Sequence, residues 1–350
     1  LIITSILITC AVFVVNFGQK QKPLPFYQQQ LDAAKLMQRC MDSLVSANEM
    51  NSSESKAISD RNNTGLIGLE YSSITTTLGD LSAKRSATNP DFAALLVRWF
   101  HELKLMPGDV IAIGCSGSFP GLILATICAA EIMQLMPVLI SSVTASSYGA
   151  NRPEWTWLDM EHYLNEIGLI YTRSQAASLG GARDVALEFD PETKHLLYQG
   201  IERNNIPLIY EEDRELNVQK RAGVYEQHGA PKIFINIGGA QINVGDYALE
   251  QRLSPGANRI RLKSSRASHS MTEYFAQKSV PIIHLLHIEK ILVENKLPVD
   301  PIPLSIPGKS AVYYSESLGD VYKLSSILLV SLAIIILIFG NRHVSVKSDF

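Results

Sequence analysis

The sequence predicts an α/β domain with a mostly parallel, Rossmann-like sheet flanked by helices, and a transmembrane helix at each end of the chain. Three observations lead to this fold class. Short apolar runs alternate with helical stretches through the middle of the chain, as in a parallel sheet with helical crossovers. Small residues follow several of these runs. A long apolar run lies near each end, which is typical of membrane spans.

The composition is that of an ordinary globular protein. The 350 residues are 46% hydrophobic and 19% charged, with a net charge of -3, which excludes a disordered chain and gives no sign of nucleic-acid binding. The four cysteines, Cys10, Cys40, Cys115 and Cys128, form no C-x-x-C pair, so we predict neither a structural disulfide nor a zinc site. No dinucleotide, P-loop or H-E-x-x-H motif is present, and we expect no cofactor.

The two apolar ends predict membrane anchors. Residues 1–17 and 324–339 are each slightly short of the ~20 residues that cross a bilayer, and tilt or flanking residues make up the difference. The alternative for the first run is a cleaved signal peptide. No A-x-A-like cleavage site follows it and the chain does not begin with Met, so we interpret residues 1–18 as a truncated anchor and residues 324–340 as a second one.

The charges beside the anchors indicate a membrane orientation. The tail, residues 341–350, carries Arg342, His343 and Lys347, so the positive-inside rule places it in the cytoplasm and the main domain outside. Lys20 and Lys22 favour the opposite orientation.

The elements between the anchors follow from local patterns. Residues 19–63 form a linker and a helix, and the apolar stripe over 26–50 fits either a stalk or a helix packed on the main domain. Residues 64–308 form the α/β domain, and 309–323 a second linker. The predicted strands of the α/β domain are residues 110–113, 138–142, 185–189, 207–210, 232–237 and 280–286. Its predicted helices are residues 89–105, 122–135, 158–167, 192–204, 213–228, 271–278 and 288–296.

The segment from Pro107 to Gly121 is the centre of the predicted site. A buried strand leads into Gly-Cys-Ser-Gly-Ser-Phe-Pro-Gly, where Gly117 permits a sharp turn and Pro120 suits the first turn of a helix. Such a loop is expected to point backbone N–H groups and serine hydroxyls at one spot near a helix N-terminus. That spot suits a carboxylate, a phosphate or an oxyanion.

Ligands of parallel sheets bind beyond the carboxyl ends of the strands, where small and polar residues collect in this sequence. The predicted ligand-binding residues there are Cys115, Ser116, Gly117, Ser118, Ser141, Ser142, Asn236, Gly238 and Gly239.

Two interpretations of the serines stay open. Ser116 begins a pattern like the G-x-S-x-G nucleophile elbow, although Ser118 replaces the last glycine. A catalytic site would then use Ser116 or Ser118 as nucleophile, with His284, or His287 or His269, as base. The alternative, which we favour, is a turn that packs a helix or binds an anion without chemistry.

Further polar groups have a functional and an ordinary interpretation. Lys84 and Arg85, with the Thr75–Thr77 run and Glu70, suit an acidic polymer or its monomer, or form a solvated loop. Asp159 and His162 are three residues apart on a helix and suit an acid–base pair, but a helix cap and a surface histidine are the favoured interpretation.

Long blocks of the sequence resemble one bacterial family. They are Gly68-Leu-Glu-Tyr-Ser with the Ile-Thr-Thr-Thr-Leu-Gly-Asp-Leu that follows, Gly-Asp-Val-Ile-Ala-Ile-Gly-Cys-Ser-Gly-Ser-Phe-Pro, Ile140-Ser-Ser-Val-Thr-Ala-Ser-Ser-Tyr-Gly-Ala-Asn and Phe234-Ile-Asn-Ile-Gly-Gly. Over about residues 60–308 the chain is similar to the poly-gamma-glutamate system proteins. Cys115 stands where the family pattern has a small residue such as Ala.

The resemblance implies a pathway and a membrane setting, not a reaction. It implies an accessory component of poly-gamma-glutamate synthesis or export in the bacterial cytoplasmic membrane. The expected partners are the polymer or its glutamate units, other membrane subunits of the system, and lipid. The alternative function is a serine-dependent hydrolase or transferase acting on the gamma-glutamyl amide bond.

Overall fold

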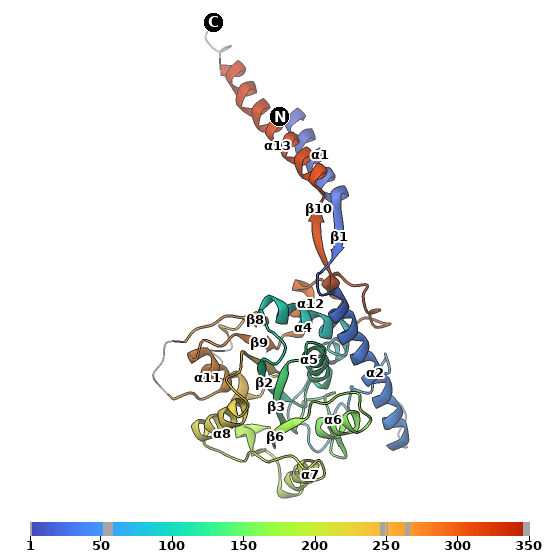
Figure 1. Cartoon of the computed structure of the whole chain (residues 1–350), viewed down its shortest axis with the longest axis vertical. Coiled ribbons are helices and arrows are strands. Elements are labelled where there is room, and N and C mark those ends of the chain that lie inside the picture. The colour runs from blue at the N-terminus through green and yellow to red at the C-terminus, as the bar shows by residue number, and fades with distance from the viewer. Residues whose placement is uncertain (1, 52–58, 246–248, 250, 263–266, 346–350) are drawn as a thin grey trace. The chain divides into compact units, whose positions relative to one another are not determined.

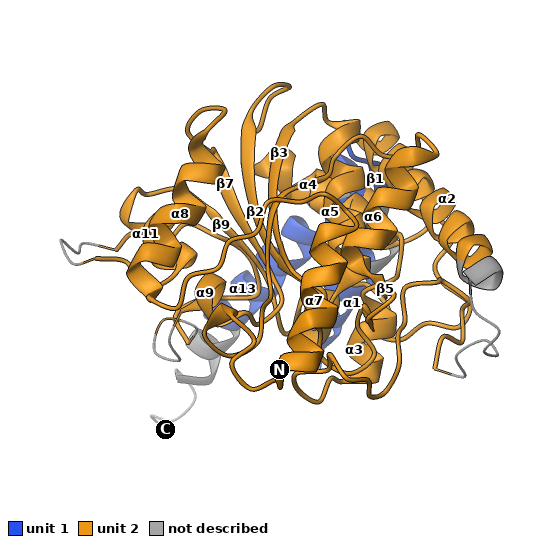
Figure 2. Ribbon diagram, turned by 90° about the horizontal axis from the view of Figure 1, so that it is seen from below, with its two compact units in different colours: residues 1–25, 314–350 blue, residues 26–313 orange. Residues whose placement is uncertain are grey.

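The computed structural model describes residues 2–51, 59–245, 249, 251–262 and 267–345. The chain forms two compact units, which are considered separately. One comprises residues 1–25 and 314–350, and the other comprises residues 26–313 (Figures 1 and 2). Residues 346–350 of the predicted tail lie outside the described residues.

The larger unit is built on a six-stranded sheet in the order β6-β3-β2-β7-β9-β8. Neighbouring strands from β6 to β9 are parallel, and β8 pairs antiparallel with β9. From β2 the chain first builds β3 and β6 on one side and then β7 and β9 on the other, which makes the end of β2 a topological switch point. The strands are β2 (Val110–Ser116), β3 (Met136–Ser142), β6 (Ser174–Ser178), β7 (Ile233–Ile237), β8 (Gly256–Asn258) and β9 (Ile282–Leu285).

Helices cover both faces of this sheet (Figure 2). One face packs against α8 and α11, while α5 lies on the other with α2 and α4 around it. The helices are α2 (Tyr27–Asn51), α3 (Leu81–Ser86), α4 (Asp91–Glu102), α5 (Pro120–Ile132), α6 (Trp157–Glu166), α7 (Pro191–Glu202), α8 (Arg214–Glu226), α9 (Gln241–Val244), α11 (Met271–Gln277) and α12 (Ile288–Glu294).

The core between the sheet and α8 and α11 is aromatic. The Phe234 and Phe275 rings stack with their centroids 4.8 Å apart, and Tyr225 packs against both. The Tyr225 hydroxyl donates to the Ile113 carbonyl of β2 at 3.2 Å, so its polar atom is satisfied within the core. This packing holds β2 and β7, the two strands at the switch point, in place.

The sequence-based strands are partly right. The predictions at 110–113, 138–142, 232–237 and 280–286 are confirmed as β2, β3, β7 and β9. The predicted strand at 185–189 is wrong, because Asp184 and Ala186 have positive φ and the chain turns there. The segment 207–210 makes only an isolated bridge, between Leu208 and Ala177 of β6. Strands β6 and β8 were not predicted.

The helix α2 belongs to the larger unit. Its buried face carries Ala33, Met37, Cys40 and Leu44, and it packs against α4 and α5. Of the two interpretations of this helix, packing on the main domain is confirmed. The compact unit therefore begins at residue 26, well before the predicted start at residue 64.

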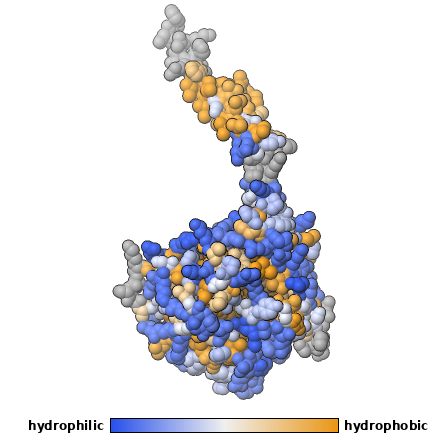
Figure 3. All heavy atoms as spheres, in the orientation of Figure 1, coloured by the Kyte–Doolittle hydropathy of each residue, from blue (hydrophilic) through white to orange (hydrophobic). Residues whose placement is uncertain are grey.

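The smaller unit contains the two apolar ends. Within it α1 (Ile2–Gly18) packs along α13 (Asp320–Ser345), and β1 (Gln19–Pro23) pairs antiparallel with β10 (Tyr314–Leu318). Figure 3 shows apolar residues covering the helical part. Among the described helices, one is long and apolar enough to cross a membrane, namely α13 over Asp320–Phe339. Its apolar stretch has a mean hydropathy of 2.5, and 6% of that stretch is buried. Of the two predicted spans, the C-terminal one is thus a candidate by length and composition, whereas α1 is too short to qualify, since it is apolar only over Ile2–Val15.

Candidate functional site

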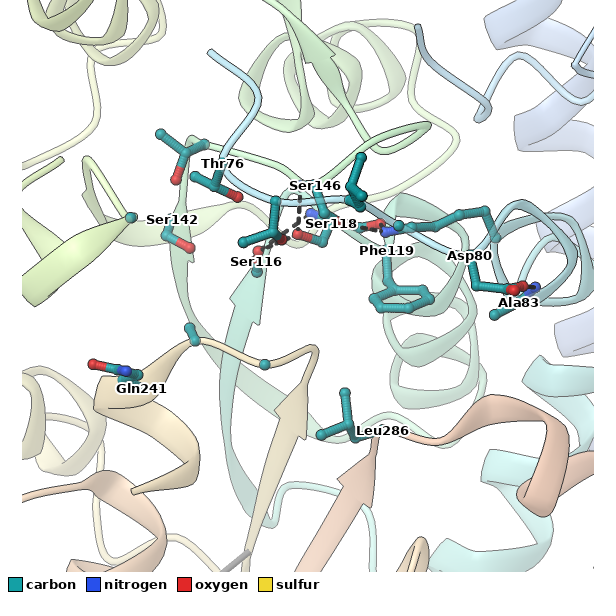
Figure 4. Close-up of a pocket in the computed structure, with 18 of the residues that line it drawn as sticks. Thr76, Asp80, Ala83, Ser116, Ser118, Phe119, Ser142, Ser146, Gln241 and Leu286 are labelled. Atoms are coloured by element: carbon teal, nitrogen blue, oxygen red, sulfur yellow. Dashed lines mark hydrogen bonds between the residues drawn. The ribbon is translucent and has the colours of Figure 1, made fainter. Parts of the chain in front are cut away.

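A cavity of about 520 Å³ opens at the carboxyl ends of β2, β3, β7 and β9, at the predicted edge of the sheet (Figure 4). Its walls are mostly hydroxyl-bearing and small residues, with three ionisable side chains, Asp80, Lys84 and Glu188. The lining residues are Thr76, Thr77, Leu78, Gly79, Asp80, Ala83, Lys84, Ser116, Ser118, Phe119, Ser142, Thr144, Ser146, Gly181, Ala182, Glu188, Gly239, Ala240, Gln241 and Leu286.

The loop after β2 is held by its own hydrogen bonds. The Gly117 N–H donates to the Ser142 carbonyl at 3.0 Å, the Ser118 N–H to Ser116 Oγ at 3.2 Å, and the Phe119 N–H to the Ser116 carbonyl at 3.2 Å. The expectation that this loop points its N–H groups at a ligand is therefore wrong, since these donors are already used. A side chain at Gly117 would place its Cβ 3.0 Å from the Val143 carbonyl oxygen, so the tight turn needs glycine.

The positive group of the cavity is the side chain of Lys84. It lies on α3, a short helix whose N-cap Asp80 accepts a hydrogen bond from the Ala83 N–H at 2.7 Å. Lys84 Nζ donates to the Ser118 carbonyl and to Ser146 Oγ, the latter at 2.7 Å, and lies 3.8 Å from the centre of the Phe119 ring. The loop after β2 thus offers a carbonyl to a cation instead of N–H groups to an anion.

Lys84 is buried and forms no ion pair among the described residues. The residue is 3% exposed, and no described carboxylate lies within ion-pair distance of its ammonium group. Burial of the ammonium lowers the pKa of Lys84 to about 7, although the charge of the nearby Asp80 opposes this shift. Buried cations are normally paired, so an unpaired one at the wall of a cavity makes Lys84 the candidate functional group of this site.

Two of three linked serines, Ser118 and Ser146, contact this lysine. The Ser116 hydroxyl donates to Ser118 Oγ at 2.9 Å, and the Ser146 N–H donates to the same oxygen at 2.9 Å. Figure 4 shows Ser116, Ser118 and Ser146 close together, with Gln241 and Leu286 apart from them and from each other. Loops from β2 and β3 are therefore tied together by the oxygen of Ser118.

The predicted site residues divide into two groups. Lys84, Ser116, Ser118, Ser142 and Gly239 line the cavity, as Thr144 also does. The other predicted residues, Cys115, Gly117, Arg85, Ser141, Asn236, Gly238 and His284, are not among the lining residues.

The second group has structural contacts instead. Cys115 Sγ lies 3.1 Å from Ser141 Oγ, and burial raises the pKa of the Cys115 thiol to about 12. Arg85 forms an ion pair with Asp300 at 3.1 Å. Arg85 and Lys84 are thus adjacent in sequence but do not act on one site.

His284 is placed away from the serines. The histidine is completely buried on β9, and Asn236 Nδ2 lies 3.0 Å from its Nδ1. Burial lowers the pKa of His284 to about 4, with the nearby His287 acting in the same direction. Asn236 also donates to the Gly238 carbonyl at 2.9 Å, which shapes the turn after β7. His284 therefore supports this turn, and no hydrogen bond joins it to Ser116 or Ser118 among the described contacts.

On helix α6, the contacts of Asp159 and His162 agree with a helix cap and a surface histidine, the interpretation favoured from the sequence. Asp159 Oδ2 accepts from the Thr156 N–H at 2.6 Å, which closes a capping box, and His162 lies 3.3 Å from Glu166. Within the part of the chain that the structure describes, no group of three His, Cys, Asp or Glu residues is placed to hold a metal ion.

Sequence reasoning missed several cavity residues. Ser146, Gly79, Glu188 and Gln241 line it; Gly79 and Ser146 lie within the blocks that carry the family resemblance, but none of the four was singled out as a site residue. The rule that ligands lie beyond strand ends covers Ser146, since it follows β3 by a few residues, and extending that rule to whole loops would have found it. Comparisons of the chain with protein-family models, curated proteins and solved structures find no match.

Proposed function

We propose that this chain is a membrane-anchored component of a poly-gamma-glutamate system, and that its α/β domain binds gamma-linked glutamyl units in the cavity beside Lys84. The observation that carries the binding proposal is the buried Lys84 ammonium, which lines the cavity with no carboxylate paired to it among the described residues. A glutamyl carboxylate supplies the missing charge. The pathway rests on the sequence resemblance over residues 60–308.

The cavity limits how much of an anionic chain it accepts. Besides Lys84, its ionisable lining residues are Asp80 and Glu188, both acidic. One carboxylate fits beside Lys84, while the hydroxyls of Thr76, Thr77 and Ser142 suit the amide groups of a gamma-linked backbone. We therefore expect recognition of one or two glutamyl units and not of a long polyanionic segment.

The anchoring part of the proposal uses both apolar helices. The helix α13 is a candidate span, and α1 packs along it within the same unit. We propose that the two form a membrane hairpin, with the α/β domain outside the cytoplasm and with other subunits of the synthesis or export system as partners.

Binding of short gamma-linked glutamate oligomers to the full chain in detergent, measured by calorimetry, tests the ligand. Lys84→Met should weaken this binding at least tenfold, because a charge-assisted hydrogen bond contributes about 1.5–3 kcal/mol. The matched control is Lys290→Met, which removes a helical lysine whose side chain is 57% exposed. Absence of binding by the wild type would contradict the ligand, and equal binding by Lys84→Met would contradict the site.

The serine-dependent alternative changes in the light of the geometry. The sequence predicts Ser116 or Ser118 as nucleophile and His284 as base. Among the described contacts, no hydrogen bond joins His284 to either serine. The serine hydroxyl that lies against an amine is that of Ser146, whose Oγ accepts a hydrogen bond from Lys84 Nζ.

A further inference from the structure

The side chains of Lys84 and Ser146 meet in the cavity, although they are 62 positions apart in the chain. Lys84 Nζ and Ser146 Oγ are 2.7 Å apart, and both residues line the cavity. An amine and a hydroxyl at this distance form a nucleophile–base pair when the amine is neutral.

Each member of the pair is held by further contacts. The Ser146 N–H donates to Ser118 Oγ at 2.9 Å, which fixes the backbone of the serine to the loop after β2. Lys84 Nζ donates to the Ser118 carbonyl and lies over the Phe119 ring. The amine and the hydroxyl are therefore positioned by the same loop.

Gly79 lies against both members of the pair. A Cβ at Gly79 would lie 3.0 Å from Lys84 Cε, 3.2 Å from Ser146 Oγ and 2.5 Å from the Ser147 carbonyl oxygen. The absence of a side chain at Gly79 lets residues 76–80 pass over the pair without pushing the amine and the hydroxyl apart.

The hydrogen bonds also favour Ser146 over the two serines of the β2 loop. Ser118 Oγ already accepts from Ser116 and from the Ser146 N–H, and the Ser116 hydroxyl is used as the donor to Ser118. Ser146 Oγ is the serine oxygen that lies against Lys84 Nζ.

We propose that Ser146 is a nucleophile and Lys84 its general base in acyl transfer from an amide, an activity that goes beyond binding and takes its substrate class, the gamma-glutamyl amide, from the proposed function. Ser146 Oγ attacks the amide carbon while its proton passes to Lys84 Nζ. The C–N bond then breaks, Lys84 returns the proton to the leaving nitrogen, and the acyl group stays on Ser146 as an ester. Water, or the amine of another glutamyl unit, attacks this ester and frees the serine, again with Lys84 taking and returning one proton.

Binding and attack use different protonation states of Lys84. The ammonium attracts a carboxylate, whereas the neutral amine accepts the serine proton. Because burial lowers the pKa of Lys84 to about 7, both forms are populated at neutral pH. Carboxylate binding should therefore weaken as pH rises through about 7, and nucleophilic attack should accelerate over the same interval.

An alkyl fluorophosphonate tests the pair without reference to the natural substrate, since a nucleophilic serine displaces its fluoride and keeps the phosphonyl group. The full chain in detergent is treated between pH 6 and pH 8 and digested for peptide mass spectrometry. We expect the adduct on Ser146, formed faster as pH rises, absent in Ser146→Ala and at least a hundredfold slower in Lys84→Met. Ser147→Ala is the matched control, because Ser147 bonds to the Thr77 carbonyl and should leave labelling unchanged.

Three results would overturn the assignment: no adduct on Ser146, an adduct on Ser116 or Ser118 instead, or equal labelling in Lys84→Met. If the Lys84→Met chain fails to fold, the pH dependence of labelling in the wild type decides, and a flat profile counts against Lys84 as the base.

A second arm separates this inference from the binding proposal. The full chain is incubated with poly-gamma-glutamate, and chain length is followed by gel electrophoresis in the wild type, Ser146→Ala and Ser147→Ala. Shortening that is lost only in Ser146→Ala supports both proposals. Oligomer binding without labelling or shortening removes the acyl transfer and keeps the binding function. Labelling of Ser146 without oligomer binding removes the glutamyl ligand and keeps the nucleophile.

Discussion

Lys84 and Arg221 are both buried cations of the α/β unit, with side chains 3% and 1% exposed, but their surroundings differ. Arg221 donates to Asp184 at 2.6 Å, to Ser178 Oγ at 2.8 Å and to Asn217 Oδ1 at 2.9 Å. Lys84 meets one carbonyl, one hydroxyl and one aromatic face.

The difference also appears in their protonation. Burial acts to lower the pKa of both groups. At Arg221 the Asp184 carboxylate and Tyr225 more than compensate and the pKa is raised, whereas the pKa of Lys84 falls to about 7. A buried cation with a full set of acceptors stabilises the fold, and one without a countercharge at a cavity wall is available to a ligand or a proton.

The largest expected effect is on stability at Arg221. Arg221→Met leaves the buried Asp184 carboxylate, which is 5% exposed, without its cation, so the free energy of unfolding should fall by about 3–5 kcal/mol. Urea denaturation of the full chain in detergent, followed by near-ultraviolet circular dichroism, measures it.

The neighbouring Arg183→Met is the control, because its side chain is 62% exposed and its ion pair with Glu212 spans 4.0 Å. That change should stay within about 0.5 kcal/mol. If Arg221→Met were equally mild, the contrast between the two buried cations would have no basis in stability.

A smaller effect is expected at Lys84. Lys84→Met removes an uncompensated charge from the interior together with its hydrogen bonds, and these contributions oppose each other. The free energy of unfolding should therefore stay within about 1 kcal/mol of the wild type, while oligomer binding and Ser146 labelling fall. A loss as large as that of Arg221→Met would show that Lys84 is a structural cation too.

Strands that are apolar and buried on both faces could be predicted from the sequence. Val110-Ile-Ala-Ile and the β7 segment Ile233–Ile237 have the continuous apolar pattern of central parallel strands. Strand β6 is Ser-Gln-Ala-Ala-Ser, which contains no β-branched or aromatic residue, so composition gave no signal for it. Its place at the sheet edge comes from pairing with β3, a contact that no local pattern encodes.

The site was predictable as a place but not as a mechanism. Strand ends and the Gly-Ser loop located the cavity, and Lys84 was predicted as a ligand-binding residue. The pattern could not show that the loop N–H groups are used internally, nor that Arg85 pairs with Asp300. The contact between Lys84 and Ser146 depends on how α3 and the loop after β3 are brought together by the fold, so neither spacing nor residue type reveals it.

The prediction most specific to Lys84 is a pH dependence of stability. The pKa of Lys84 is about 7 in the folded chain and its ordinary value is 10.5, so between these values the unfolded chain binds a proton that the folded chain lacks. Stability from this group therefore rises with pH across that interval and does not change below it. The difference in unfolding free energy between the wild type and Lys84→Met should shift in favour of the wild type by roughly 2 kcal/mol from pH 7 to pH 9. The difference in unfolding free energy between the wild type and Ser147→Ala, which removes no titrating group, should not change with pH. A flat difference for Lys84→Met as well would mean that Lys84 keeps its proton throughout, which would leave it as a binding group and exclude it as the base for Ser146.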